Sequence, residues 1–244
     1  MGQKVTVITA TYNNAAGLRK IMNGVAGQDY DSIEYIIVDG ASTDDTPSVL
    51  QEAREKFGER VRIISEPDTG IYSAINKGLK AATGDIIGCC FDEYADRHVL
   101  GKMVRTMEQE ASDGIHGDLL YMDNGRIIRK WHMGQGKIRY GWLPGHPTFY
   151  LKKSIYERYG LYKENYKVAA DYEFMVRCLK DGNVKLAYIP EVLVHMAYGG
   201  TSNSSLSAYL TSLKEGHRAL KENGIPFAWF TDMCRTIRVL LQFQ

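Results

Sequence analysis

Two adjacent carboxylates stand at the end of a buried run in the middle of the sequence. The stretch "GDIIGCCFDEYAD" (84–96) starts with residues typical of an internal strand and then places Asp92 beside Glu93. Hard divalent cations such as Mg²⁺ and Mn²⁺ take oxygen ligands, and one or two carboxylates together with phosphate oxygens are enough. Such a cation stabilises a negatively charged leaving group. The pair therefore predicts a site for a metal ion and a charged substrate.

Polar side chains also follow three earlier predicted strands. They are Thr11, Tyr12, Asn13 and Asn14, then Asp39, Gly40 and Ser42, then Glu66 and Asp68. In open α/β sheets ligands bind at the carboxyl ends of the strands, so we expect these residues on one edge, together with Asp92 and Glu93. The alternative is that the aspartates are ordinary turn and N-cap residues, which Asp favours.

Alternating strands and helices are predicted to position these residues. The strands are expected at 4–10, 33–39, 61–68 and 84–91, and the helices at 17–28, within 42–58 and at 71–83. Hydrophobic periodicity sets the helices, while short β-branched runs set the strands. This order predicts an α/β fold with a parallel sheet covered by helices on both faces.

The regular alternation of strands and helices ends after residue 96. The pattern predicts a helix at 95–111, a hairpin at 115–131 turning at 123–125, a loop at 140–150 that feeds a strand, short helices at 154–160 and 171–182, a strand at 184–196, and one long helical tail from about 206 to the end. This second half has no internal repeat and no low-complexity linker.

Composition excludes several classes of protein. With 244 residues, 44% of them hydrophobic, the chain can bury a large core, and its net charge of +1 gives no reason to expect a nucleic-acid partner. The four cysteines show neither a disulfide framework nor metal-binding spacing, and no stretch approaches 18 apolar residues. We expect no signal peptide and a reducing, cytoplasmic setting.

Several motifs in order resemble family-2 glycosyltransferases of the GT-A fold. The opening "TVITATYNNAAGLRKIMNGVAGQDYDSIEYIIVDGASTDDT" and "SEPDTGIYSAINKGLKAATGDIIG" are similar to their nucleotide-binding part. "GHPTFYLKKSIYERYGLY", "VAADYEFMVRCL" and "YIPEVLVHMAYGGTSN" resemble acceptor-half motifs of bacterial members that build surface polysaccharides. The resemblance implies a single domain over 1–205, with a Rossmann-like nucleotide-sugar half (1–96) and an acceptor half (97–205) on a mixed, mostly parallel sheet. A helical tail (206–244) follows.

The resemblance also implies roles for individual residues. Asp39 reads the base of the nucleotide, which is most often uridine, and Asp68 lies near the base or ribose. Gly40 and Gly70 allow the backbone to turn or to approach a ligand, while Asn76 and Lys77 face either the donor phosphates or solvent. The predicted donor-binding set is Thr9, Thr11, Tyr12, Asn13, Asp39, Gly40, Ser42, Glu66, Asp68, Gly70, Asn76, Lys77, Asp92 and His146. His195 is a third candidate metal ligand beside Asp92 and Glu93, and 199–203 is a candidate lid.

The resemblance implies that Asp171 is the catalytic base, because the corresponding acidic residue usually has this role in the family. A sugar hydroxyl attacks poorly until its proton is removed, and Asp171 starts a predicted helix whose dipole favours the ionised carboxylate. The alternative is an N-cap Asp with Glu173 as a first-turn charge. The resemblance implies an inverting, metal-dependent transfer from a UDP-sugar to a glycan or lipid-linked glycan.

One departure from the family pattern affects the metal site. Family members usually end the fourth strand with Asn-Ser-Asp-Asp or Asn-Ala-Asp-Asp, whereas this chain has Cys89-Cys90-Phe91-Asp92-Glu93 and is about two residues shorter. This leaves open a sugar-nucleotide-binding protein that has lost activity. A nucleotidyltransferase is the other alternative, whereas G-x-G-x-x-G, P-loop and G-x-S-x-G signatures are missing.

The tail carries a helical stripe of Trp229, Phe230, Met233, Ile237, Leu240 and Leu241, flanked by Arg235 and Arg238. Such a helix could lie on the inner face of the cell membrane beside a lipid-linked acceptor. It could equally pack on the core of the domain or on a second subunit.

Overall fold

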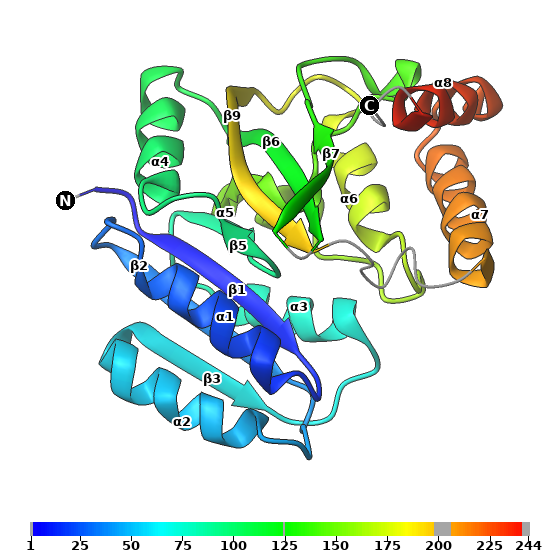
Figure 1. Cartoon of the computed structure of the whole chain (residues 1–244). Coiled ribbons are helices and arrows are strands. Elements are labelled where there is room, and N and C mark those ends of the chain that lie inside the picture. The colour runs from blue at the N-terminus through cyan, green and yellow to red at the C-terminus, as the bar shows by residue number, and fades with distance from the viewer. Residues whose placement is uncertain (1, 124, 198–205, 241–244) are drawn as a thin grey trace.

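A single mixed sheet runs through the whole domain. The computed structural model describes residues 2–123, 125–197 and 206–240. Within them, nine strands form one sheet in the order β3-β2-β1-β4-β8-β6-β9-β5, and β7 pairs with β6 outside this path. Figure 1 shows helices on both sides of the strands. The predicted α/β class, with a mixed sheet covered by helices, is confirmed.

The first half of the sheet is parallel throughout. Its strands are β1 (Val5–Thr11), β2 (Ile33–Asp39), β3 (Val61–Ser65) and β4 (Ile86–Cys89). β1 lies between β2 and β4, and β3 pairs with the outer side of β2. β2 has the Val and Ile content and the burial of a strand covered on both faces. All four carboxyl ends therefore point to the same edge.

Six helices divide between the two faces of the sheet. They are α1 (Ala15–Ala26), α2 (Thr46–Phe57) and α4 (Val99–Gln109) on one face, and α3 (Ile71–Ala81), α5 (Lys153–Tyr159) and α6 (Ala170–Leu179) on the other. Each group packs into its own hydrophobic cluster. Cys90 belongs to the first cluster and Cys89 to the second, as expected for neighbours at a strand end.

The second half of the sheet contains antiparallel pairs. β8 (Tyr150–Lys152) lies antiparallel between β4 and β6 (Gly114–Asp123), and β9 (Leu186–Ala197) runs parallel to β6. β6 and β7 (Arg126–Trp131) form the predicted hairpin. A two-residue strand, β5 (Glu93–Tyr94), pairs antiparallel with β9 and was not predicted, because only this long-range pairing makes it a strand.

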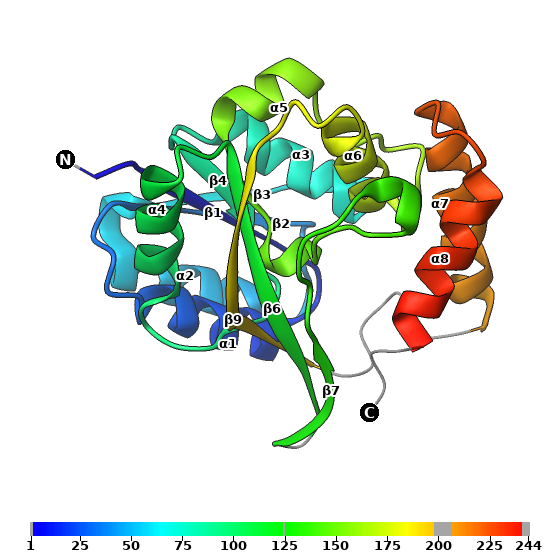
Figure 2. The ribbon, with the colours of Figure 1, turned by 90° about the horizontal axis from the view of Figure 1, so that it is seen from above.

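The C-terminal segment consists of two helices, so the prediction of one continuous helical tail is wrong. α7 (Leu206–Glu222) ends before Gly224, which has a positive φ of 71°, and α8 (Ala228–Leu240) begins after Pro226. Glycine tolerates the left-handed conformation and proline cannot continue a helix, so both residues break the tail. The two helices lie side by side at the end of the molecule away from the N-terminus (Figure 2). In the described part of the chain, every helix is too short or too polar to cross a bilayer.

Candidate active site

The carboxyl ends of β1, β2 and β3 converge at Gly40. The Gly40 amide donates to the Thr11 carbonyl over 3.0 Å. A Cβ atom added at Gly40 would lie 2.9 Å from Asp68 Oδ2 and 3.2 Å from Tyr12 Cδ2, so the backbone passes close to both side chains. The structure thus brings these predicted residues together at one edge. Tyr12, which is 64% exposed, forms the open side of this place.

Asp39 organises the turn that follows β2. Its carboxylate is buried and accepts from the Ser42 hydroxyl (2.5 Å), the Ser65 hydroxyl (2.6 Å) and the Ser42 amide (3.2 Å). The Asn13 amide donates to Ser42 Oγ over 2.8 Å, and Asn13 Oδ1 accepts from the Thr43 amide. Both carboxylate oxygens of Asp39 are thus engaged with the turn and with β3, and base recognition by Asp39 stays a prediction.

Two predicted donor contacts lie elsewhere. Thr9 is fully buried and donates its hydroxyl to the Cys90 carbonyl, so it supports the edge from beneath instead of lining it. Asn76 is also buried, because its side-chain amide bonds to both the carbonyl and the amide of Tyr162. It therefore faces neither phosphate nor solvent, contrary to both alternatives.

Lys77 closes the loop between β3 and α3. Its ammonium group donates to the Pro67 carbonyl over 2.7 Å and lies 3.0 Å from a Glu66 carboxylate oxygen. Both Lys77 and Glu66 are therefore engaged with each other in the structure. A role in phosphate binding stays a prediction for Lys77.

The start of α3 links the strand edge to the predicted base. Asp68 Oδ1 accepts from the Gly70 amide over 2.9 Å, and Gly70 has a φ of 143°, which only glycine adopts readily. Two residues later, the Tyr72 hydroxyl donates to Asp171 Oδ1 over 3.0 Å. Burial raises the pKa of Tyr72 and the neighbouring Asp171 charge raises it further, so the hydroxyl stays protonated and acts as a donor.

Asp171 combines a fixed carboxylate with an open oxygen. It lies in the first turn of α6, where the helix dipole stabilises negative charge. Oδ1 is held by Tyr72, whereas Oδ2 accepts no hydrogen bond from the described residues. A carboxylate oriented in this way can take a proton from a bound hydroxyl.

Glu173, two residues further, is a structural residue. It is fully buried, and its carboxylate lies 2.9 Å from both Arg177 and Lys163 and accepts from the Asn223 side chain over 3.1 Å. Burial alone would raise the pKa of Glu173, but the hydrogen bonds from Arg177, Lys163 and Asn223 outweigh it and lower the pKa. The two acidic residues of "DYE" thus have different roles.

Glu215 of α7 anchors the segment in front of Asp171. Its buried carboxylate accepts from three consecutive backbone amides, those of Lys167 (2.8 Å), Val168 (3.0 Å) and Ala169 (3.1 Å). Ala169 is the residue that precedes α6, so Glu215 caps this helix from another element. No local pattern could have identified Glu215, because this contact joins residues 46 to 48 positions apart.

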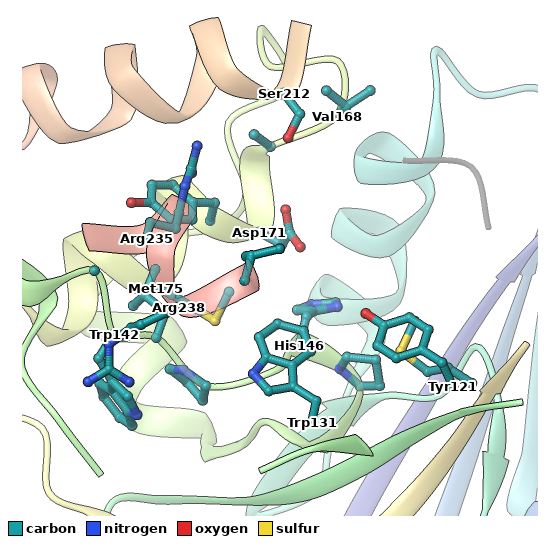
Figure 3. A pocket seen from close by; sticks show the side chains of 18 residues that line it. Tyr121, Trp131, Trp142, His146, Val168, Asp171, Met175, Ser212, Arg235 and Arg238 are labelled. Carbon is teal, nitrogen blue, oxygen red and sulfur yellow. The ribbon is translucent and has the colours of Figure 1, made fainter. Parts of the chain in front are cut away.

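Asp171 opens into a pocket of about 300 Å³ between the second half and α8 (Figure 3). Trp131, Trp142 and Tyr121 give it aromatic walls, while α8 contributes Arg235 and Arg238. The full lining is Tyr121, Trp131, Gly141, Trp142, Leu143, Pro144, His146, Pro147, Val168, Ala169, Asp171, Tyr172, Met175, Met196, Ser212, Arg235, Arg238 and Val239. The aromatic walls were not predicted from the sequence, and the two arginines were predicted only to flank a helical stripe.

His146 joins this pocket to the end of β4. Its ring stacks on Phe91 with centroids 6.2 Å apart, and its Nε2 shares a 2.9 Å hydrogen bond with the Tyr162 hydroxyl. Burial lowers the pKa of His146, and the nearby Asp171 charge opposes this shift. His146 therefore lies between the predicted base and the strand edge, as a donor or acceptor contact requires.

The three predicted metal ligands approach one another through strand pairing. Glu93 lies opposite His195 in the β5–β9 ladder, and Asp92 Oδ1 accepts from the Ala197 amide over 3.2 Å. Glu93, however, forms an ion pair with Lys20 of α1. Among residues 2–123, 125–197 and 206–240, no three acidic, histidine or cysteine side chains are arranged to hold a metal.

The side chains at the end of β4 nevertheless offer the oxygen ligands that a hard cation prefers. Asp92 and Glu93 offer carboxylate oxygens at adjacent positions, and burial raises the pKa of Asp92, with the Glu93 charge adding to the rise. A partly buried carboxylate with a raised pKa gains from a nearby cation. The candidate lid, 199–203, lies outside the described residues.

Comparison with known sequences finds glycosyltransferases. The family model described as "Glycosyl transferase family 2" matches residues 6–177. A "PGL/p-HBAD biosynthesis glycosyltransferase" of Mycobacterium bovis is 27% identical over 214 residues, which cover 82% of this chain and 79% of that protein. An uncharacterized glycosyltransferase of Mycobacterium tuberculosis is 30% identical over 192 residues, covering 71% of this chain and 68% of its own length.

Solved structures share the fold. TarS 1–349 of S. aureus superposes with a TM-score of 0.73 at 17% identity, covering 98% of this chain and 72% of TarS 1–349. It has also been solved in complex with UDP-GlcNAc. The mannosyltransferase PcManGT from Pyrobaculum calidifontis, in complex with GDP-Man and Mn²⁺, has a TM-score of 0.70 at 18% identity, covering 99% of this chain and 75% of that protein. The fold is the GT-A fold of these enzymes.

Proposed function

The chain belongs to glycosyl transferase family 2, and we propose that it moves a sugar from a UDP-sugar to a hydroxyl acceptor with inversion at the anomeric carbon. The observation that carries this proposal is the position of Asp171. Its Oδ1 is fixed by Tyr72, its other oxygen is open, and it lies between the start of α3 and an aromatic pocket. This arrangement suits a base that faces an acceptor on one side and a donor on the other.

The reaction would proceed as a single displacement. The acceptor hydroxyl lies in the pocket, Asp171 removes its proton, and its oxygen bonds to the anomeric carbon as the bond from that carbon to the diphosphate breaks. The nucleoside diphosphate leaves toward the strand edge. Attack from the face opposite the leaving group inverts the anomeric carbon, and the His146 side chain helps to shape the junction between donor and acceptor.

The donor would lie on the strand edge of the 1–96 half. Tyr12, Gly40 and Asp68 converge there, and Asp39 supports the turn from beneath. The UDP-GlcNAc complex of TarS and the GDP-Man complex of PcManGT support a nucleotide-sugar donor in this fold. We assign the acceptor to the 97–205 half together with α8.

Asp92 and Glu93, with His195 as a further candidate, would hold a Mn²⁺ or Mg²⁺ ion. Such an ion, when bound, neutralises the charge that accumulates on the departing diphosphate. The Mn²⁺ in the PcManGT complex supports this assignment. Within this chain, Lys20 pairs with Glu93 Oε1 and competes with a cation for that carboxylate.

A glycan or lipid-linked glycan is the acceptor we favour, in bacterial polysaccharide or glycan synthesis. Tryptophan and tyrosine rings provide flat apolar faces on which a sugar ring can stack. All four cysteines are free thiols, which supports a reducing, cytoplasmic location. The C-terminal helix would form either a peripheral contact with the membrane or the interface of a dimer.

A donor screen tests the proposal. Thermal unfolding is recorded with UDP-sugars, GDP-sugars and nucleoside triphosphates, each with and without Mn²⁺, because a ligand at 100 times its Kd stabilises the native state by about 2.7 kcal/mol. We expect a UDP-sugar to raise the Tm most, and to release UDP slowly when Mn²⁺ is present. Stabilisation by a triphosphate with release of pyrophosphate would identify a nucleotidyltransferase, and binding without turnover would identify a sugar-nucleotide-binding protein.

A further inference from the structure

Helix α8 turns its most apolar stripe toward solvent. Trp229, Met233, Ile237 and Leu240 are spaced by four, four and three residues, so they lie on one side of the helix. They are 63%, 46%, 48% and 65% exposed. A surface helix of a globular domain normally faces its apolar stripe to the core. Core packing, one of the alternatives from the sequence, is therefore wrong for these four residues of the predicted stripe, and Leu241 lies outside the described residues.

The opposite side of α8 is fixed to the protein by polar contacts. Arg235 lies over the Tyr172 ring at 4.7 Å, and Arg238 Nε donates to the Tyr140 carbonyl over 3.1 Å. The Thr231 hydroxyl donates to the Arg139 carbonyl over 3.2 Å. These contacts hold the helix with its arginines inward, as Figure 3 shows for Arg235 and Arg238, and its apolar stripe outward.

Cations and aromatic rings border the stripe. Lys137 and Arg139 are exposed at the short helical turn Ile138–Tyr140, which packs against α8. The Tyr140 ring is 43% exposed and packs edge-on against Phe230. The one carboxylate of α8, on Asp232, is engaged with His217 Nδ1 over 2.7 Å. Phe227, which is 74% exposed, extends the apolar surface at the start of the helix. The surface is thus apolar along its centre and cationic at its border.

We infer that α8 docks on an anionic phospholipid surface, with the stripe of Trp229, Met233, Ile237 and Leu240 in the interface. Interfacial helices combine an apolar face with Lys or Arg, and tryptophan and tyrosine rings favour the depth of the headgroups. Each cation near an anionic leaflet adds to the attraction. A second copy of the chain fits less well, because a two-fold contact buries the same surface of both copies. The cations beside the stripe would then meet no free carboxylate of α8, since Asp232 is engaged with His217.

Docking would place the pocket beside the membrane. Arg238 and Val239 of α8 line the pocket that contains Asp171, so a helix resting on lipid holds the pocket next to the surface. This step rests on the proposed function. It assigns a lipid-linked acceptor whose hydroxyl reaches Asp171 while its lipid stays in the bilayer.

Flotation of the full chain with vesicles tests the docking. Vesicles of phosphatidylcholine alone are compared with vesicles in which about one-third is phosphatidylglycerol. The variant Met233→Ser/Ile237→Ser removes apolar surface from exposed positions, and Met233→Leu/Ile237→Leu is the matched control. We expect binding to anionic vesicles that weakens at high salt, a loss of about tenfold or more in the serine variant, and full binding of the leucine variant.

Three results would overturn the docking: no flotation of the wild type with anionic vesicles, equal flotation of the serine variant, or a dimer that the serine variant converts to a monomer. Donor-induced thermal shifts are measured on the same variants and should not change. A protein that floats but binds no nucleotide sugar would disprove the proposed function and leave the docking intact. A protein that binds the donor and does not float would disprove the docking and leave the proposed function intact.

Discussion

Replacement of Glu215 by Gln should destabilise the protein and slow catalysis together. The Glu215 carboxylate accepts from the amides of Lys167, Val168 and Ala169, with one oxygen serving the first and the other oxygen serving the second and third. Glutamine keeps only one acceptor oxygen and presents an NH₂ group to the remaining amides. At least one amide next to α6 therefore loses its partner.

The magnitude follows from these contacts. A hydrogen bond to a charged group contributes about 1.5–3 kcal/mol, and a buried donor without a partner costs about 1–3 kcal/mol. We expect a loss of about 2–4 kcal/mol in the free energy of unfolding. For a domain of this size, each kcal/mol lowers Tm by about 2–4 °C, so the transition should fall by roughly 4–16 °C.

Two measurements on the same samples test this reasoning. Thermal unfolding reports stability, and UDP release at saturating donor reports turnover, which should fall by up to about 10²-fold because Asp171 shifts. Glu52→Gln is the control, since its ion pair with Arg19 lies on the surface. The reasoning is refuted if Glu215→Gln unfolds at the same temperature as Glu52→Gln.

Two further substitutions test other parts of the structure. Gly40→Ala should weaken donor binding by about three- to tenfold, because the new Cβ displaces Asp68 and Tyr12, whereas Gly24→Ala, whose Cβ enters open space, should not. His116→Phe should change the pH dependence of stability. Burial lowers the pKa of His116 to about 4, so as pH falls from 6.5 to 4 the unfolded state alone takes up the proton and the native state loses about 3 kcal/mol. When Tm is measured between pH 6.5 and 4, the Phe variant should lose less stability than the wild type. A pH profile identical to that of the wild type would contradict this prediction.

The first half of the fold could be predicted from the sequence because its signals are local. β2 was predicted with its observed bounds, and the β-branched runs and helical periodicity located the other strands and helices within a few residues. β5 could not be predicted, because two residues become a strand only by pairing with β9. The break of the C-terminal tail was predictable, since Gly224 and Pro226 are visible in the sequence.

The positions of candidate residues could be predicted where strand ends or helix starts define them, whereas their roles stay predictions. Asp68, Gly40 and Asp171 follow from such positions, and the structure places Asp171 beside the pocket. Asn76 was misplaced because periodicity locates a helix without telling which polar side chain turns inward. Glu215 was missed because its partners lie on a distant segment.

The central claim is that Asp171 removes the proton from the acceptor, and the Asp171→Asn variant tests it most directly. The measurement compares turnover with donor affinity, using the donor that gives the largest thermal shift and Asp31→Asn, an exposed carboxylate, as the control. The account predicts that turnover of Asp171→Asn falls by about 10²- to 10⁴-fold while the donor Kd is unchanged. Unchanged turnover, or a loss of donor binding in parallel with the rate, would contradict it.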